Sequence, residues 1–230
     1  MGNNTFYKGD VFEILNSQIA SKSVDLIYID PPFATTKNTW DEELDWKALF
    51  TEMFRVLKDT GMLIIHCSIP FNYQLIRDAP KSPSHSWYWT KDAHTNPLIS
   101  KVQPLRDTEE ILIWKNKKGV YYPQKIGNEP QRSTYMTKTD YFGKDTKKSV
   151  SINYGKFRTH HITMKRDIQG FSTRPEELVK LMIDSYSKEG DTILDLFCYK
   201  GITSRCKGNR NWIGIDKYFV PDCLFTFQKE

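Results

Sequence analysis

Residues 24–33 read VDLIYIDPPF, and this stretch decides the fold of the chain. Its first seven residues, Val24–Asp30, form a short apolar run with several β-branched side chains, which is typical of a strand buried in a parallel sheet. The run ends at Asp30 because two prolines follow, and proline cannot donate a hydrogen bond to a neighbouring strand. The stretch therefore predicts a buried strand that ends in a carboxylate, then a rigid turn, then the aromatic ring of Phe33.

Short runs of the same kind predict further buried strands. They are Met62–Cys67, Ile111–Trp114, Thr192–Phe197 and Trp212–Asp216, with the aromatic run Ser86–Trp89 as another candidate. Helical patterns separate them. One helix is predicted from an N-cap at Asp45, with apolar residues on one face as far as Leu57 and Gly61 closing the connection to the next strand. A second is predicted over Pro175–Ser187, with Pro first and two Glu in the first turn. This alternation predicts an α/β domain with a mostly parallel sheet.

Composition restricts the class of protein. A chain of 230 residues with 39% hydrophobic residues can bury one sizeable core. Its apolar runs are shorter than the ~18 residues that a membrane-spanning helix needs. The four cysteines contain no CxxC pair, so they predict reduced thiols and neither a metal site nor a secreted framework. We therefore expect a cytoplasmic protein with no membrane partner and no metal.

Positive charge is concentrated in one segment. Between Lys115 and Arg166 lie 13 Lys and Arg against three acids, so this segment carries a formal +10 and the remainder −5. Seven aromatic residues are interleaved with these cations, a composition that suits a nucleic acid whose bases can stack. A solvated insertion with a few Tyr anchors explains the charge equally well. We predict a basic insertion over 115–166, between a catalytic half at 1–114 and a cofactor-binding half at 167–230.

The Asp30–Phe33 tetrapeptide can hold an exocyclic amine. The Asp30 carboxylate and the Pro31 carbonyl could each accept one N–H, which would free the nitrogen lone pair from conjugation with the base. The φ angles fixed by Pro31 and Pro32 would keep those acceptors in place. Phe33 offers a flat face for a base that has left a duplex. The simpler alternative is that the two prolines only end a strand, although the carboxyl end of a parallel strand is where α/β sheets bind ligands.

A second cluster fits a nucleotide-like cofactor. Asp195 lies near the end of a predicted strand, and a short turn containing Gly201 leads into a helix. About 20 residues later, Asp216 closes the next strand, where a carboxylate can bind ribose hydroxyls. With one glycine in the turn, this pattern alone is a weak indication.

Taken together, these motifs resemble the β class of amino-DNA methyltransferases, a circularly permuted family. Its order is a catalytic tetrapeptide, a target-recognition insertion and a cofactor loop, and here the same order is DPPF at 30–33, the basic insertion, FSTRPEEL at 171–178 and DTILDLFCYKGIT at 191–203. WIGID at 212–216 and YKGDVFEIL at 7–15 also match family segments, so the resemblance spans nearly the whole chain.

The resemblance implies a fold, a reaction and partners. The fold is a Rossmann-like methyltransferase sheet, mostly parallel with one antiparallel strand and circularly permuted. The reaction is methylation of adenine N6 in double-stranded DNA by S-adenosylmethionine, with flipping of the target base. Asp30 favours adenine, since cytosine-N4 enzymes more often carry Ser at that position. Cytosine-N4 or RNA methylation, or a catalytically silent DNA-binding subunit, are the alternatives. Family members often pair, so a homodimer or a heteromeric partner is expected. The resemblance also implies a cytoplasmic or nucleoid-associated location in a bacterial, phage or viral context.

The resemblance also assigns roles to residues. Asp30, Pro31, Pro32 and Phe33 match the catalytic motif. The residues that match cofactor-binding positions are Asp10 near the adenine; Ser172, Thr173, Arg174 and Pro175 at the methionine end; Asp195, Phe197 and Gly201 in the loop; and Asp216 at the ribose.

Three positions depart from the family pattern: Tyr199 replaces a loop glycine, Thr173 replaces Gln, and Arg174 replaces Lys. A side chain at 199 must point away from the cofactor or reshape its pocket. Nucleic-acid contacts are expected from basic residues, namely Lys37, Arg132, Lys147, Lys148, Arg158 and Arg166.

Overall fold

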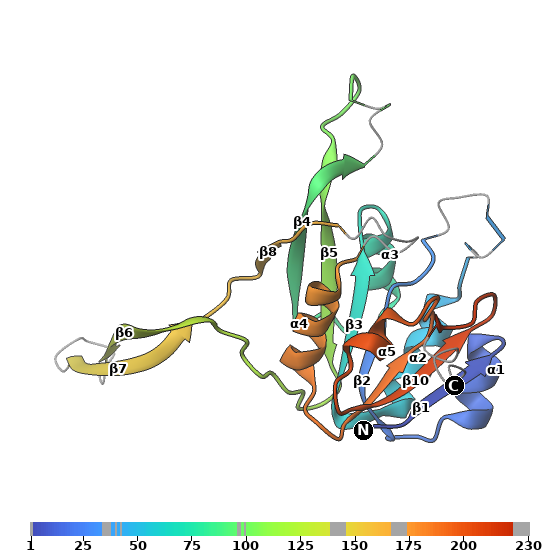
Figure 1. Ribbon diagram of the computed structural model, residues 1–230, viewed down its shortest axis with the longest axis horizontal. Coiled ribbons are helices and arrows are strands. Elements are labelled where there is room, and N and C mark those ends of the chain that lie inside the picture. Colours follow the sequence, from blue (N-terminus) through green and yellow to red (C-terminus); the bar gives the residue numbers. More distant parts are fainter. Residues whose placement is uncertain are drawn as a thin grey trace, which may run out of the picture. The chain divides into compact units, whose positions relative to one another are not determined.

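The computed structural model describes residues 2–33, 38–39, 41, 43–95, 98, 100–138, 146–166 and 174–222. The chain forms two compact units. The larger consists of Met1–Tyr122 together with His160–Glu230, and the smaller is Pro123–Thr159 (Figure 1).

An eight-stranded sheet forms the centre of the larger unit. The strands are β1 (Asn4–Lys8), β10 (Asn211–Asp216), β9 (Thr192–Asp195), β2 (Val24–Ile29), β3 (Leu57–Cys67), β5 (Arg106–Lys115), β4 (His85–Thr95) and β8 (His161–Thr163), in that spatial order. Of these strands, β5 alone is antiparallel, to both β3 and β4. The prediction of a mostly parallel sheet with one antiparallel strand is confirmed.

Strands far apart in the sequence are neighbours in this sheet. The late strands β9 and β10 lie between β1 and β2, and β9 pairs in parallel with β2 through Leu26 and Ile27. Because β10, β9 and β2 are adjacent and parallel, the residues that follow them gather at one edge of the sheet (Figure 1). The last quarter of the sequence and the VDLIYIDPPF stretch are thus brought side by side.

Helices cover the two faces of the sheet. The alternating side chains of β2 separate into two apolar clusters: Ile27 and Ile29 belong to one, Leu26 and Tyr28 to the other. The first cluster includes residues of α1 (Val11–Gln18), α2 (Trp46–Val56) and α3 (Phe71–Asp78), and the second includes residues of α4 (Glu176–Tyr186) and α5 (Ile202–Cys206). A strand buried on both faces explains why its sequence is apolar throughout.

The predicted helices are present with small changes at their ends. Asp45 caps α2 by accepting a hydrogen bond from the Ala48 amide, as its position predicted. The expectation for Gly61 is wrong, because β3 begins at Leu57 and Gly61 lies inside it, so no loop separates α2 from the strand. Among the described residues, no helix is long and apolar enough to cross a membrane.

The smaller unit contains an antiparallel hairpin that the sequence did not predict. Its strands are β6 (Ile126–Lys138) and β7 (Thr146–Lys156), paired from Ile126↔Lys156 to Lys138↔Thr146. Residues 123–159 contain eight Lys and Arg against three acids, a formal +5 that equals the charge of the whole chain. The hairpin unit therefore holds the net positive charge, and the larger unit is neutral by the same count.

Candidate functional site

Three acidic residues mark the carboxyl edge of the sheet. Asp30 directly follows β2, Asp195 ends β9 and Asp216 ends β10. Because these strands are neighbours and parallel, the three predicted carboxylates belong to one region of the fold, although 186 positions separate the first from the last. Carboxyl ends of parallel strands are the usual ligand-binding edge of such sheets.

Asp30 is held by Arg174. The Nη2 atom of Arg174 lies 2.7 Å from Asp30 Oδ1 and 3.0 Å from Glu109 Oε2, so one guanidinium nitrogen is shared between two carboxylates. Glu109 in turn contacts Lys91 Nζ at 2.5 Å. The four residues form a chain of alternating charge, Lys91–Glu109–Arg174–Asp30.

This charged chain is mostly buried. The side chains of Lys91, Glu109 and Arg174 are 5%, 10% and 12% exposed, whereas that of Asp30 is 32% exposed. Asp30 is thus the member of this series of ion pairs that is most exposed to solvent. Burial raises the pKa of Asp30 to about 6, Glu109 raises it as well, and the charges of Arg174 and Lys91 oppose the rise.

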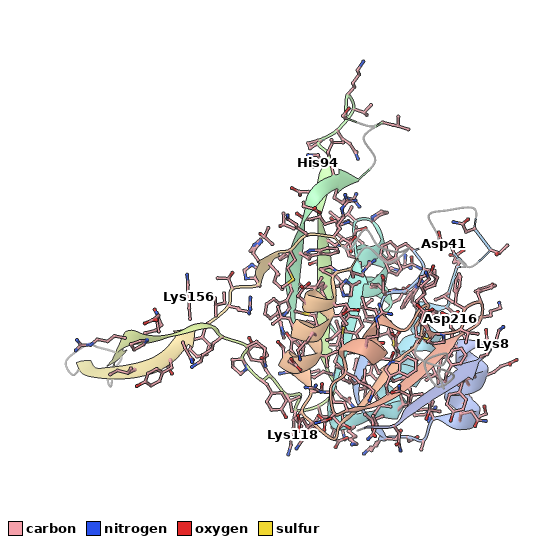
Figure 2. All side chains as sticks on the ribbon, viewed as in Figure 1. Lys8, Asp41, His94, Lys118, Lys156 and Asp216 are labelled. Carbon is pink, nitrogen blue, oxygen red and sulfur yellow. The ribbon has the colours of Figure 1, made fainter. Side chains whose placement is uncertain are left out.

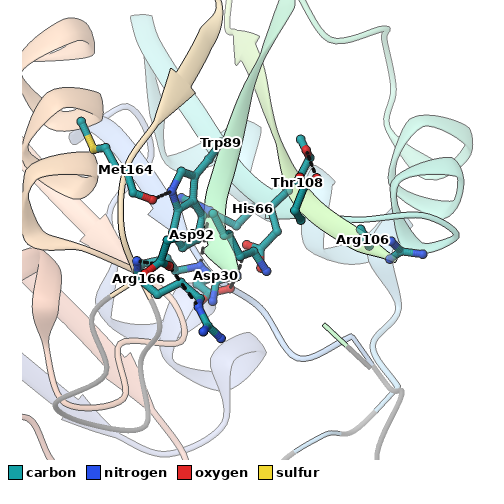
Figure 3. A network of polar contacts seen from close by, with 12 residues as sticks. Asp30, His66, Trp89, Asp92, Arg106, Thr108, Met164 and Arg166 are labelled. Atoms are coloured by element: carbon teal, nitrogen blue, oxygen red, sulfur yellow. Dashed lines mark hydrogen bonds and ion pairs between the residues drawn. The ribbon is translucent and has the colours of Figure 1, made fainter. Parts of the chain in front are cut away.

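A neutral histidine lies beside this chain, close to Asp30 (Figure 3). His66 is fully buried, and burial together with the charges of Arg174 and Lys91 lowers its pKa well below the usual value. Its Nδ1 accepts a long hydrogen bond of 3.4 Å from Arg174 Nε, so Nε2 carries the proton and donates to the Tyr28 hydroxyl at 2.7 Å. His66 therefore supports the orientation of the guanidinium without adding charge.

Phe33, the aromatic member of the Asp30–Phe33 tetrapeptide, rests on a ring cluster. Phe33 stacks on Phe71 with centroids 4.9 Å apart, and Trp46 meets Phe71 edge-on at 5.2 Å. Phe33 is only partly buried, as is Pro32, whereas Pro31 is buried. The ring at position 33 thus has a fixed support from α2 and α3 and keeps exposed surface.

Asp195 is directed into the protein. Its Oδ2 accepts a hydrogen bond of 2.5 Å from the Thr203 hydroxyl, whose oxygen accepts one from Trp212 Nε1 at 2.8 Å, and its Oδ1 accepts from the Phe197 amide at 3.3 Å. Burial raises the pKa of Asp195 to about 7 against the lowering effect of these bonds. These contacts connect the end of β9 to α5 and fix the intervening loop.

Asp216 organises two loops through backbone amides. Its Oδ2 accepts from the Tyr199 amide, and its Oδ1 accepts from those of Tyr218 and Phe219, each at 2.8 Å. A carboxylate has about four acceptor positions, so three bonds leave capacity for a ligand hydroxyl. Its place at the end of β10 is visible in Figure 2. The remaining acceptor position of Asp216 could hold one ribose hydroxyl.

The loop keeps a left-handed backbone at the position where the family has glycine. Tyr199 has a φ of 45° and Gly201 a φ of 75°, and both lie in the region that favours glycine. The Tyr199 ring packs edge-on against Phe219, with centroids 4.4 Å apart. The tyrosine thus takes the conformation of a glycine and places its ring on the segment that follows β10.

The remaining predicted residues fall into several environments. Asp10 caps α1, accepting from the amides of Phe12 and Glu13 at 2.9 and 3.3 Å, and its neighbour Gly9 bonds to the Asp216 carbonyl at 3.1 Å. Pro175 is buried at the start of α4. Lys37, Ser172 and Thr173 lie outside the described residues.

The predicted nucleic-acid residues belong to both units. Arg166, in the larger unit, pairs with Asp92 at 3.4 Å (Figure 3). Arg132 lies exposed on β6 and Arg158 follows β7. Lys147 and Lys148 lie on β7.

Sequence reasoning missed the partners of Arg174. Glu109 and Lys91 lie on β5 and β4, 65 and 83 positions from Arg174, and a single sequence does not reveal such pairing. One local signal existed: Glu109 and Glu110 immediately precede the apolar run ILIW, and a carboxylate entering a buried strand needs a partner. Among the described residues, no group of three or more His, Cys, Asp or Glu could hold a metal ion.

Comparisons with known proteins point to DNA methyltransferases. Residues 24–219 match the model of the N6_N4_Mtase family, described as DNA methylase. The Type II methyltransferase M.BamHI of Bacillus amyloliquefaciens is 26% identical over 230 residues, which cover 91% of this chain and 53% of that protein. The chain thus spans about half the length of this relative.

Solved structures show the same fold. The complex of M1.HpyAVI with SAM has a TM-score of 0.62 at 20% identity, covering 93% of each chain. The cytosine-N4-specific PvuII DNA methyltransferase has a TM-score of 0.64 at 13% identity, covering 94% of this chain and 83% of that one. At these identities the likeness establishes a Rossmann-like methyltransferase fold.

Proposed function

Because the chain belongs to the N6/N4 family of DNA methylases, we propose that it transfers a methyl group from S-adenosylmethionine to an exocyclic amine of DNA, with adenine N6 as the acceptor. The observation that carries the proposal is the position of Asp30. It follows a central parallel strand, is partly exposed, and is anchored by Arg174 at 2.7 Å.

In the proposed mechanism Asp30 and the Pro31 carbonyl accept the two N–H bonds of the target amine. These contacts would draw the nitrogen toward tetrahedral geometry and stabilise the charge that develops on it. Phe33, supported by Phe71, would stack on the flipped base. A pKa of about 6 leaves Asp30 mostly ionised at neutral pH, which suits an acceptor of hydrogen bonds.

The cofactor would occupy the adjacent strand ends. Asp216 would bind a ribose hydroxyl, the loop from Phe197 to Gly201 would line the adenosine, and Arg174 would contact the methionine carboxylate. Bound S-adenosylmethionine supplies an electrophilic methyl group on sulfonium. Asp195 would act indirectly, by holding the loop through Thr203.

Double-stranded DNA is the proposed polyanion for the hairpin unit. Its formal charge of +5 and its exposed Arg132 and Lys156 favour phosphate contacts, which are the usual source of affinity for DNA. A homodimer or a heteromeric partner remains part of the proposal, since members of the resembling family pair. The proposed activity belongs to a bacterial nucleoid or to a phage or viral genome.

Cytosine N4 is the second candidate acceptor, since the PvuII enzyme, a structural neighbour, is specific for it. Asp30 at the first motif position supports adenine. A silent DNA-binding subunit is the third candidate, and Tyr199 at a glycine position motivates it. Equilibrium binding of S-adenosylmethionine, with and without DNA, separates the silent subunit from the two enzymes.

The test is transfer of labelled methyl to unmethylated DNA, followed by mass spectrometry of the nucleosides. We expect N6-methyladenine with the wild type and none with Asp30→Asn, which keeps the shape of the side chain and removes its charge. Asp59→Asn is the matched control, because Asp59 is a half-buried β3 carboxylate with ion pairs to the exposed Lys22 and Lys117. It should retain activity within about twofold, as surface pairs contribute little.

Each other outcome has a defined meaning. N4-methylcytosine would keep the mechanism and overturn the choice of base. Absence of product on every DNA tested, together with absence of cofactor binding, would support the silent subunit.

A further inference from the structure

Glu109 and Asp30 compete for one nitrogen of Arg174. Nη2 lies 2.7 Å from Asp30 Oδ1 and 3.0 Å from Glu109 Oε2, so neither carboxylate has this donor to itself. The Nε atom of Arg174 is directed to His66 Nδ1 at 3.4 Å. A planar guanidinium fixed at two of its nitrogens has little freedom to turn toward one carboxylate.

Lys91 completes the balance of charge. Its ammonium contacts Glu109 Oε1 at 2.5 Å and lies 5.5 Å from the centroid of the Trp89 ring. Two cations and two anions therefore alternate in this series of ion pairs, and three of its four members, Lys91, Glu109 and Arg174, are nearly buried. Such a chain satisfies each buried charge, whereas removal of one inner member leaves an unpaired charge in a site of low dielectric.

We infer that Glu109, held by Lys91, is a positioning residue for the acceptor site: it retains part of the Arg174 guanidinium and thereby limits how strongly Arg174 binds Asp30. The inference rests on the proposed function, in which Asp30 accepts an N–H of the target amine. A carboxylate bound fully by arginine is a weaker acceptor for a second donor. Dividing the guanidinium between two carboxylates keeps Asp30 anchored and still basic enough to accept.

The charged neighbours of Asp30 shift its pKa in the directions that this inference requires. Arg174 and Lys91 lower the pKa of Asp30, and Glu109 raises it. Two further ionisable neighbours are Asp195, whose pKa is raised by the charge of Asp30, and Tyr28, which like His66 is uncharged at neutral pH. Loss of the Glu109 charge should therefore lower the pKa of Asp30, both directly and by releasing Arg174 to it.

The first experiment needs no activity. The carboxyl carbon of Asp30 is titrated by NMR in the cofactor-free protein, with its signal assigned by its absence in Asp30→Asn. We expect a lower pKa of Asp30 in Glu109→Gln than in the wild type. Glu110→Gln is the matched control, because the next residue of β5 faces the other side and its Oε2 accepts from Asn72 Nδ2 at 2.9 Å. In this control the pKa of Asp30 should equal that in the wild type.

In Glu109→Gln the buried Lys91 loses its ion-pair partner, and this unpaired charge could unfold the protein. The double variant Lys91→Met with Glu109→Gln therefore removes both charges together. We expect the pair to regain thermal stability and still to show a lowered pKa of Asp30, since Glu109 has the larger effect of the two on that pKa. Glu109→Asp retains the negative charge on a shorter side chain, so the pKa of Asp30 in this variant should lie close to that in the wild type.

The second experiment measures kcat and KM for methyl transfer across pH. Glu109→Gln should lower kcat roughly 10–100-fold with little change in KM for DNA, and the acidic limb of the profile should move to lower pH, as expected for a misplaced acceptor. An Asp30 titration and a kcat that are both unchanged in Glu109→Gln would overturn the inference. If the wild type methylates no DNA, the proposed function fails, and the titration still decides the role of Glu109.

Discussion

The left-handed backbone of Tyr199 carries a free-energy cost, which can be measured by comparing glycine and alanine at this position. A non-glycine residue at a φ of 45° is disfavoured because its Cβ approaches the backbone, and glycine has no such penalty. Tyr199→Gly and Tyr199→Ala both remove the ring that packs on Phe219. We therefore expect the Gly variant to be more stable than the Ala variant by about 1 kcal/mol in urea unfolding.

The matched control for this pair is Lys200, the next residue, which is not among the positive-φ positions. There the order should reverse, with Ala more stable than Gly by about 0.5–1 kcal/mol, because glycine loses more backbone entropy on folding. The same order at both positions would contradict the left-handed conformation of Tyr199.

Asp195 predicts a pH dependence of stability with an unusual sign. Its pKa is raised to about 7 in the folded protein from about 4 in the unfolded chain, so the folded state binds more protons between these values. Stability from this group is therefore highest at low pH and falls as pH rises from about 4 to 7. The slope reaches about 1.4 kcal/mol per pH unit for one proton.

The measurement is urea unfolding of wild type and Asp195→Asn at steps from pH 4 to pH 8. Subtracting the two curves removes the contributions of groups that do not interact with Asp195. The same comparison in an Asp30→Asn background removes that of Asp30, whose charge raises the pKa of Asp195. The difference should slope between pH 4 and 7 and become flat above it. Parallel curves throughout would show that Asp195 titrates normally.

At the scale of an element, Asp10 has two separable roles. As the N-cap of α1 it accepts two amide hydrogen bonds, and the resemblance assigns its charge to the cofactor. Asp10→Ala should cost about 1 kcal/mol of stability, and Asp10→Asn only a few tenths because Asn caps equally well. If the charge also contacts the cofactor, Asp10→Asn should lower affinity for S-adenosylmethionine in calorimetry. Unchanged affinity in the Asn variant would leave Asp10 as a cap alone.

The elements that sequence predicted best are those in which local pattern and burial agree. The α2 helix has an N-cap and an apolar face, and β2 is apolar along its length, so both were found within one residue of their bounds. The first part of β3 was missed because Lys58–Gly61 is polar and ends in glycine, which indicates a turn. Its pairing with Val24 at Leu57 made it a strand instead, an effect of tertiary structure.

The site divides in the same way. Asp30, Asp195 and Asp216 end apolar strands, so local sequence identified them and the sheet order brought them together. The pairing of Arg174 with Asp30 and Glu109 spans up to 144 positions and depends on how α4, β2 and β5 meet. The β6–β7 hairpin was not predicted because its strands are polar and lack the apolar alternation that marks a half-buried sheet.

At the scale of the whole molecule, the net positive charge and the proposed acceptor site lie in different units. The hairpin unit carries the formal +5, and the larger unit holds the acidic strand ends. If the hairpin supplies phosphate contacts, then neutralising it should weaken DNA binding and leave the cofactor site intact. Arg132→Ala with Lys156→Ala removes two exposed cations from opposite strands of the hairpin (Figure 2 marks Lys156).

We expect this double variant to bind a DNA duplex more weakly, with the slope of log affinity against log salt reduced in magnitude by about 0.9 for each phosphate that the variant no longer neutralises. Affinity for S-adenosylmethionine should be unchanged. Lys118→Ala is the control, since Lys118 is an exposed cation of the larger unit. Fluorescence anisotropy across a salt series gives both affinity and slope. An equal loss in the control would indicate a diffuse effect of net charge, and an unchanged slope in the double variant would remove the hairpin from the DNA interface.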